Sequence, residues 1–104
     1  MERICFNFQL KSEMEDEYKR RHDQIWPELV AAIKEAGISN YSLFRRGREV
    51  IAYAECEPDA TIAFNKVGAT EVNARWSKWF EEVIDHLTDE QGRLFRAEEV
   101  WHLD

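Results

Sequence analysis

Hydrophobic and polar side chains alternate along residues 3–10, where every even-numbered position carries a large apolar residue. This period of two predicts a strand with one buried face and one polar face. Residues 38–44 and 50–56 also have the composition of strands, and Gly47 between them predicts a hairpin turn. Residues 95–103 predict a fourth strand at the end of the chain.

The segment between the first strand and the hairpin predicts helical structure. Ser12 and Glu15 match a capping box, in which two side chains satisfy free N–H groups at a helix start. The helix that opens there is predicted to run through residue 22. Pro27 suits the first turn of a second helical piece, or a kink in one long helix, and Gly37 is predicted to end it.

Two more helices are predicted between residues 59 and 83. Asp59 can cap a short helix that ends near Gly68. Thr70 or Glu71 then begins a longer helix, in which apolar residues recur at helical spacing. The members of this apolar stripe are Val72, Trp76, Trp79, Phe80 and Val83.

The resulting order of elements is β-α-β-β-α-β, which predicts an α+β sandwich of the ferredoxin-like, split βαβ type. With 104 residues, the chain is predicted to form a single domain over residues 1–104. Both helical segments should cover one face of the sheet and leave the other face bare. Because a bare and partly apolar face is unfavourable in water, we expect two copies to pair as a homodimer.

Charge and cysteine content narrow the possible partners. The chain has 21 acidic residues against 14 Lys plus Arg, a formal net charge of -7, so neither a nucleic-acid partner nor an anionic membrane surface is expected. No apolar stretch approaches the length of a membrane span, and the first residues lack a signal-peptide pattern. Cys5 and Cys56 stand alone in predicted strands, which favours reduced, buried thiols and a cytoplasmic location.

Candidate chemistry concentrates at Tyr18, His22 and Trp26, which are four residues apart and would share one face of a helix. Histidine titrates near neutrality and is a natural proton-transfer group, while aromatic walls with polar tips suit a sugar-like ligand. The alternative for His22 is a solvated histidine on a charged helix face. For Trp26, core packing is the better interpretation.

Other candidates carry weaker signals. Tyr41 fits the core, a dimer interface or a ligand contact, with little to choose between them. Periodicity assigns Trp76 and Trp79 to the core, and Arg75 either binds an oxygen-rich ligand or lies exposed. The sequence has no metal-ligand spacing and no phosphate-binding glycine loop, so neither a metal nor a cofactor is expected.

Several motifs in combination resemble the L-rhamnose mutarotase family, and the likeness extends from the first strand to the final residues. Each motif alone is weak, whereas the combination is specific. The motifs are Tyr18-x-Arg20-Arg21-His22, Ile25-Trp26-Pro27-Glu28-Leu29, Asn40-Tyr41, Arg75-Trp76 and Glu99-Val100-Trp101.

The resemblance implies a dimeric α+β barrel that interconverts the α and β anomers of L-rhamnose in the cytoplasm. It also implies that His22 is the proton donor and that Tyr18 and Tyr41 contact the sugar. A pair of sugar-binding residues is implied at Trp76 and Ser77, where serine departs from the second aromatic residue of the family pattern. One positioned acid/base group typically supplies about 10²–10⁴-fold acceleration, which is useful for a reaction that is already fairly fast.

Trp79 is a candidate replacement for the aromatic residue missing at Ser77, although a shift of three helical positions changes its direction by roughly 60°. The second proton-transfer group is a water molecule or a tyrosine hydroxyl. Two other functions fit the same fold: a cofactor-free monooxygenase for an aromatic substrate, and a non-catalytic module that binds a small ligand.

Overall fold

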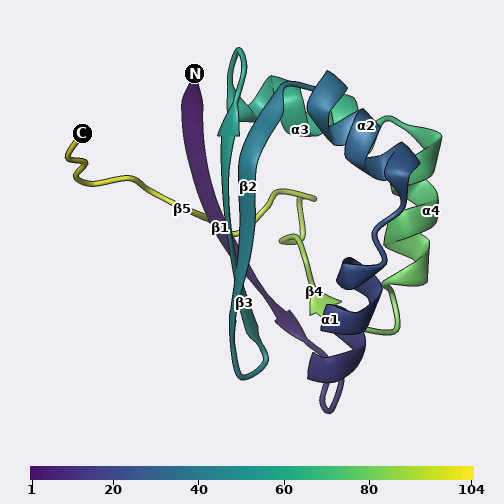
Figure 1. The fold of residues 1–104 in the computed structure, drawn as a ribbon. Helices are drawn as coiled ribbons and strands as arrows, with labels where there is room; N and C mark the ends of the chain where they lie inside the picture. Colours follow the sequence, from purple (N-terminus) through teal and green to yellow (C-terminus); the bar gives the residue numbers. More distant parts are fainter.

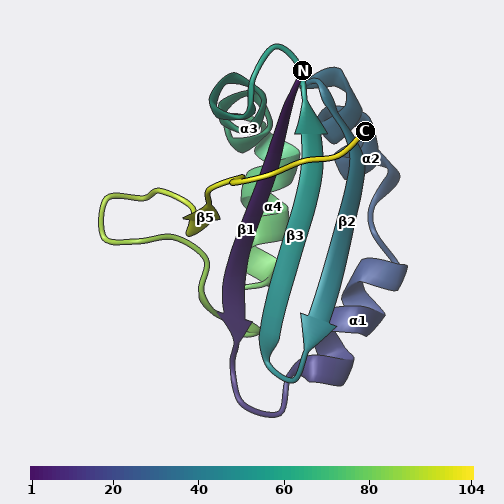
Figure 2. The same ribbon diagram turned by 90° about the vertical axis from the view of Figure 1, so that its left-hand side faces the viewer.

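The computed structural model describes residues 1–104 as an antiparallel sheet with four helices packed on one of its faces, while the other face is left without helices (Figures 1 and 2). The sheet has the strand order β2-β3-β1-β4, and β5 also pairs with β1. This order confirms the predicted ferredoxin-like α+β fold. The elements are β1 (Glu2–Leu10), α1 (Glu15–Asp23), α2 (Pro27–Glu35), β2 (Ile38–Arg46), β3 (Glu49–Cys56), α3 (Ala60–Gly68), α4 (Glu71–Trp79), β4 (Ile84–His86) and β5 (Arg96–Ala97).

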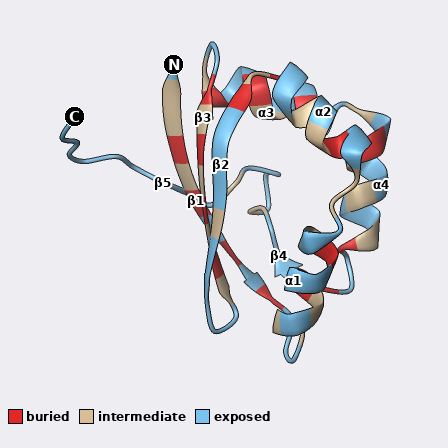
Figure 3. Ribbon diagram, in the orientation of Figure 1, coloured by how far each residue is buried: buried red, intermediate tan, exposed pale blue.

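The core lies between the sheet and the helices, and the alternation of β1 builds its floor. The even-numbered residues of β1 from Ile4 to Leu10 are buried, as are those of β3 from Val50 to Cys56 (Figure 3). The two strands pair antiparallel in register, with Phe6 opposite Ala52 and Phe8 opposite Val50. Large side chains on β1 therefore face small ones on β3. The predicted strand at residues 3–10 and the predicted hairpin around Gly47 are confirmed.

The prediction of a fourth strand over residues 95–103 was wrong. β3 lies on one side of β1, and on the other side the neighbouring strand is β4, whose Ile84 pairs with Leu10 of β1. Of the predicted segment, only Arg96 and Ala97 pair with β1. Beyond residue 97 the chain leaves the sheet, and Figure 1 shows it projecting away from the face without helices. An alternating pattern forms a ladder only where a neighbouring strand is available, and a single chain offers this segment none.

Two of the four helices, α3 and α4, begin at a side-chain cap that the sequence predicted, whereas the N-cap residues of α1 and α2 make no side-chain hydrogen bond. Asp59 accepts a hydrogen bond from the Ile62 N–H at 2.8 Å, and the Thr70 hydroxyl caps α4 in the same way. The capping box at Ser12 was wrong: α1 begins at Glu15, and its N-cap residue makes no side-chain hydrogen bond. Glu13 adopts a left-handed conformation with φ 66°, so the chain is not yet helical where the box requires it.

The proposed row of Tyr18, His22 and Trp26 is divided between two helices. α1 ends at Asp23, and Trp26 is the N-cap residue of α2, with Pro27 in the first turn. Pro27 therefore opens a second helix, the first of the two alternatives. Tyr18 and His22 remain one helical turn apart on α1.

The two cysteines are free thiols, but only Cys56 is buried. Cys5 is half-buried because it belongs to the odd-numbered face of β1, which no helix covers, so the prediction of two buried thiols was half right. None of the helices has the length and apolar content needed to cross a membrane.

Candidate active site

A cavity of about 1450 Å³ lies between the sheet and the helices, and it opens to the surface. Its walls come from β1 and β2 on one side and from all four helices on the other, with the segment before β5 at one end. A concave, mostly apolar site with a few polar groups is typical of small-molecule binding. Five predicted site residues line it together: Tyr18, His22, Tyr41, Trp76 and Ser77.

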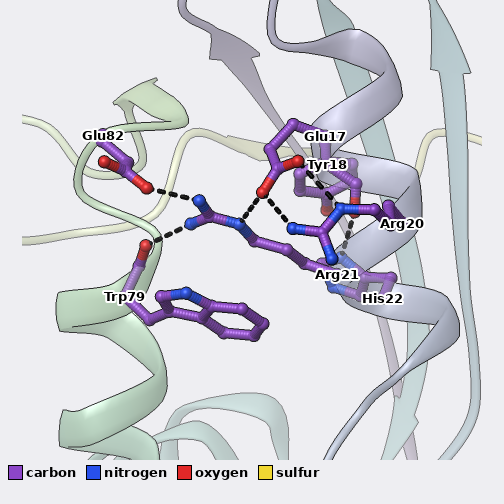
Figure 4. A network of polar contacts seen from close by, with 7 residues as sticks. All are labelled: Glu17, Tyr18, Arg20, Arg21, His22, Trp79 and Glu82. Carbon is purple, nitrogen blue, oxygen red and sulfur yellow. Dashed lines mark hydrogen bonds and ion pairs between the residues drawn. The ribbon is translucent and has the colours of Figure 1, made fainter.

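His22 and Tyr18 form the centre of this site. Their ring centroids are 4.4 Å apart, and the Nδ1 atom of His22 lies 3.2 Å from the backbone carbonyl oxygen of Tyr18 (Figure 4). A carbonyl oxygen can only accept a hydrogen bond, so Nδ1 must donate and carry the proton. In the neutral ring, Nε2 is therefore the nitrogen with a free lone pair.

Burial lowers the pKa of His22 below its ordinary value, because the apolar surroundings disfavour the charged ring. The Tyr18 carbonyl and the Asp23 carboxylate act in the opposite direction but are weaker. The ring packs edge-on against Trp76 at 5.3 Å and against Phe80 at 5.1 Å. The lowered pKa therefore favours the neutral imidazole, whose free lone pair is on Nε2.

Tyr18 is 5% exposed, and its hydroxyl makes no hydrogen bond within the protein. Burial raises its pKa, so the phenol stays protonated. Since the residue lines the cavity, its hydroxyl is a donor available to a ligand.

A β-bulge directs Tyr41 into the cavity. Ser39 pairs with Glu55 and Ser42 with Tyr53, so β2 has one extra residue between these pairs. A regular strand would place Tyr41 on the same face as Ser39, away from the helices. The bulge turns its ring toward Phe64, with centroids 6.1 Å apart.

Asn40 lies within the bulge and has a positive φ of 46°. Its side chain stabilises the bulge from the sheet face opposite the cavity. Its side-chain amide donates to Glu55 at 2.8 Å, and the Tyr53 hydroxyl donates to the same carboxylate at 2.9 Å. Tyr41 itself is 37% exposed at the cavity, yet the surrounding protein still raises its pKa to about 12. Tyr41 thus lines the cavity, and its contact with a ligand stays a prediction.

The tryptophans have different positions relative to the cavity. Trp76 is half-buried and lines it, whereas Trp79 does not. Trp79 instead stacks on Trp26, with ring centroids 5.5 Å apart. Trp79 therefore cannot replace an aromatic wall at Ser77. Arg75 does not line the cavity either, because it pairs with Glu28 at 3.2 Å on the surface.

The sequence interpretation missed Phe80, which lines the cavity, and Arg21, which lies behind it. Phe80 is 2% exposed and contacts the rings of Tyr18, His22 and Trp76. Its place in the apolar stripe of α4 indicated burial but not its neighbours. Arg21 is buried beside His22, although it stands in a run of charged residues that predicts exposure.

Ser77 contributes polar character to one wall of the cavity. It lies on α4 one helical turn from Asn73, and both residues line the cavity together with Glu81, which follows the end of the helix. No cluster of three or more His, Cys, Asp or Glu side chains is arranged to hold a metal ion.

The amino-acid sequence of the chain matches a family of known proteins. A sequence profile described as L-rhamnose mutarotase matches residues 3–103. An L-rhamnose mutarotase of Acidiphilium cryptum is 36% identical over 103 residues, covering 99% of each chain, and one of Oceanobacillus iheyensis is 32% identical over 106 residues, covering 100% of each.

Solved structures agree with the sequence comparison. The crystal structure of an L-rhamnose mutarotase from Formosa agariphila superposes with a TM-score of 0.81 at 25% identity and covers 100% of both chains. Tetracenomycin F2 cyclase from Streptomyces glaucescens has a TM-score of 0.68 at 14% identity, covering 98% of this chain and 96% of the cyclase, and shares the fold alone. These matches favour the mutarotase interpretation over a monooxygenase or a binding module. The chain belongs to the L-rhamnose mutarotase family.

Proposed function

We propose that the protein interconverts the α and β anomers of L-rhamnose in the cavity beside His22. The observation that carries this proposal is a neutral imidazole with one free nitrogen, held among aromatic rings in a cavity that is large enough for a monosaccharide. Mutarotation requires proton transfer at two oxygens of the sugar and no change of oxidation state. A single positioned acid/base group is suited to that task.

The proposed reaction begins with His22 as a base. Its Nε2 accepts the proton of the anomeric hydroxyl, and the bond between the anomeric carbon and the ring oxygen breaks to give the open-chain aldehyde. The ring oxygen takes up a proton as it leaves. Both oxygens are attached to the same carbon, so the imidazolium formed in the first transfer can return its proton to the ring oxygen. After rotation about the adjacent carbon–carbon bond, the reverse steps close the ring on the other face.

The residues around His22 stabilise the charge that develops on the sugar during these steps. The Tyr18 and Tyr41 hydroxyls stay protonated, so they act as hydrogen-bond donors toward the oxygen on which negative charge develops. We therefore propose that a tyrosine hydroxyl acts beside His22 as the second polar group of the reaction, by donating a hydrogen bond to this oxygen. Trp76 supplies an apolar wall for the ring of the sugar.

A panel of sugars tests the reaction and its specificity. Saturation-transfer NMR with a catalytic amount of protein measures exchange between the anomeric protons of L-rhamnose, L-mannose, L-fucose and D-glucose. We expect the largest acceleration for L-rhamnose, as the names of the relatives suggest. Acceleration of L-mannose would show that the polar wall at Ser77 accepts the extra hydroxyl, and failure to accelerate any sugar would refute the proposal.

The pH dependence follows from the lowered pKa of His22. We expect kcat/KM for exchange, corrected for the spontaneous reaction, to be constant near pH 7 and to fall at acidic pH with a midpoint below 6.5, the ordinary value. The unfolded protein binds a proton at His22 near pH 6.5 and the folded protein only at lower pH, so stability also declines as the pH falls through this interval. A midpoint at or above 6.5 would contradict a buried His22 base.

We also propose that the protein is a cytoplasmic homodimer, assembled through the sheet face without helices and the projecting end of the chain. Phe44 is exposed on that face, and Val100, Trp101 and Leu103 are exposed beyond β5. Large apolar side chains left exposed in this way are typical of an interface. Free Cys5 and Cys56 thiols support a reducing compartment.

Trp101→Asp tests the dimer. Trp101 is 76% exposed in the single chain, so a charge there should leave the fold intact while opposing burial in an interface. Light scattering after gel filtration should give twice the chain mass for wild type and the single mass for the variant. Ile62→Asp, on the outer side of α3, is the matched control and should remain dimeric. A monomeric wild type at micromolar concentration would exclude the proposed dimer.

A further inference from the structure

Arg21 is the one charged residue that the fold buries, with 6% of its surface exposed. A buried charge is strongly unfavourable unless several groups compensate it. Here the Nε atom donates to Glu17 at 2.5 Å, one terminal nitrogen donates to the Trp79 carbonyl at 2.5 Å, and the other donates to Glu82 (Figure 4). The guanidinium also lies 4.7 Å from the centre of the Trp79 ring.

These contacts join the last turn of α1 to the last turn of α4. α4 ends at Trp79, whose carbonyl is one of the terminal groups without a partner inside the helix. A cation at this position satisfies that carbonyl and interacts favourably with the helix dipole. Figure 4 shows the Arg21 side chain crossing the space between the two helices to reach it.

No other residue of α1 makes a polar connection to another element, although the rings of Tyr18 and His22 pack against Phe80. The remaining side-chain hydrogen bonds and ion pairs of α1 stay within the helix, including Lys19 with Asp23 and Arg20 with Glu17. Its backbone hydrogen bonds are likewise local. A helix of nine residues is marginal on its own, so its position depends on its contacts with the rest of the protein.

The same junction contains the proposed base. His22 follows Arg21 on α1, and its ring contacts Trp76 and Phe80 at the end of α4 that Arg21 holds. A change in the relative position of the two helices would therefore move the imidazole with respect to the aromatic wall of the cavity. Glu17 remains ionised in this arrangement, because Arg20 and Arg21 lower its pKa to about 2.

We propose that Arg21 is a positioning residue for proton transfer: it fixes the last turn of α1 against the end of α4 and so sets the His22 imidazole relative to Trp76. This inference rests on the proposed mutarotase function for its kinetic consequence. It assigns Arg21 no contact with the sugar, since Arg21 does not line the cavity.

The test compares Arg21→Met with Arg20→Met. Methionine has a similar length and removes the fork of donors, while Arg20 shares Glu17 but reaches no residue of α4. We expect Arg21→Met to lower kcat about 10- to 100-fold with KM changed less than about threefold, because displacement by about 1 Å is enough for a loss of that order. Arg20→Met should stay within about twofold of wild type, since exposed ion pairs contribute little.

An NMR titration of the His22 imidazole gives a readout that does not require activity. In Arg21→Met, the ring signals should shift and the pKa of His22 should rise toward 6.5 as its packing loosens, whereas Arg20→Met should leave both unchanged. Wild-type kcat and wild-type His22 signals in Arg21→Met, even with a lower Tm, would overturn the proposal and leave Arg21 a purely structural role.

If Arg21→Met fails to fold, Arg21→Lys decides the question with the same two readouts. Lysine keeps the charge but loses the planar fork that reaches three partners, so loss of kcat at near-native Tm supports positioning and unchanged kcat overturns it. Failure of wild type to accelerate anomer exchange would refute the proposed function. The His22 titration would still test the positioning role in that case.

Discussion

Replacing His22 with alanine should lower protein-catalysed exchange of the L-rhamnose anomers by about 10²–10⁴-fold, the contribution of one positioned acid/base group. The variant keeps the cavity but loses Nε2, the nitrogen that we expect to accept the anomeric proton. The sugar should still bind, because Tyr18, Tyr41 and Trp76 remain. Saturation-transfer NMR gives the exchange rate, and its dependence on sugar concentration separates kcat from KM.

His86→Ala is the matched control, since His86 is an exposed histidine that does not line the cavity. It should retain wild-type exchange. Near-UV circular dichroism and Tm report whether the His22 variant keeps its tertiary structure. Parallel loss of activity and structure would show that His22 serves packing, and wild-type activity in His22→Ala would remove it from the mechanism.

Phe80→Ala should produce the largest loss of stability, about 3–5 kcal/mol of the free energy of unfolding. The ring is 2% exposed and lies among the aromatic side chains at the junction of α1 and α4, so its removal leaves a cavity that rigid neighbours cannot fill. Since total stability is typically about 5–15 kcal/mol, a substantial part of the protein's stability depends on this one ring. Urea denaturation of the two proteins measures the difference.

Phe95→Ala serves as the comparison for Phe80, because its ring is partly exposed and lies outside the aromatic junction. It should lower stability much less. Phe80→Leu should lie between wild type and alanine, since leucine restores part of the volume. Equal losses at positions 80 and 95 would contradict the packing described for the junction of α1 and α4.

The parts of the fold that the sequence predicted depend on local patterns. The alternation along β1 identifies its buried face without knowledge of any partner strand, and Asp59 and Thr70 each cap a helix through the residue three positions further on. The site residues on α1 were recognisable because Tyr18 and His22 are one turn apart on a single short helix.

The parts that could not be predicted depend on distant neighbours. Tyr41 faces the cavity because of a bulge that Glu55 stabilises from β3, and strict alternation would have placed it on the opposite face. Arg21 is buried because the end of α4 lies beside it. The run of charged residues around Arg21 in the sequence gives no sign of this contact. The predicted fourth strand was wrong for a related reason, since residues 98–104 have no neighbouring strand within one chain.

The most direct test of the central claim follows a single anomer. Pure α-L-rhamnose is dissolved at neutral pH with and without a catalytic amount of protein, and the α and β signals are followed by NMR until they stop changing. A mutarotase should speed the approach in proportion to its concentration and leave the final ratio of anomers unchanged. An approach at the spontaneous rate, at every protein concentration, would contradict the account.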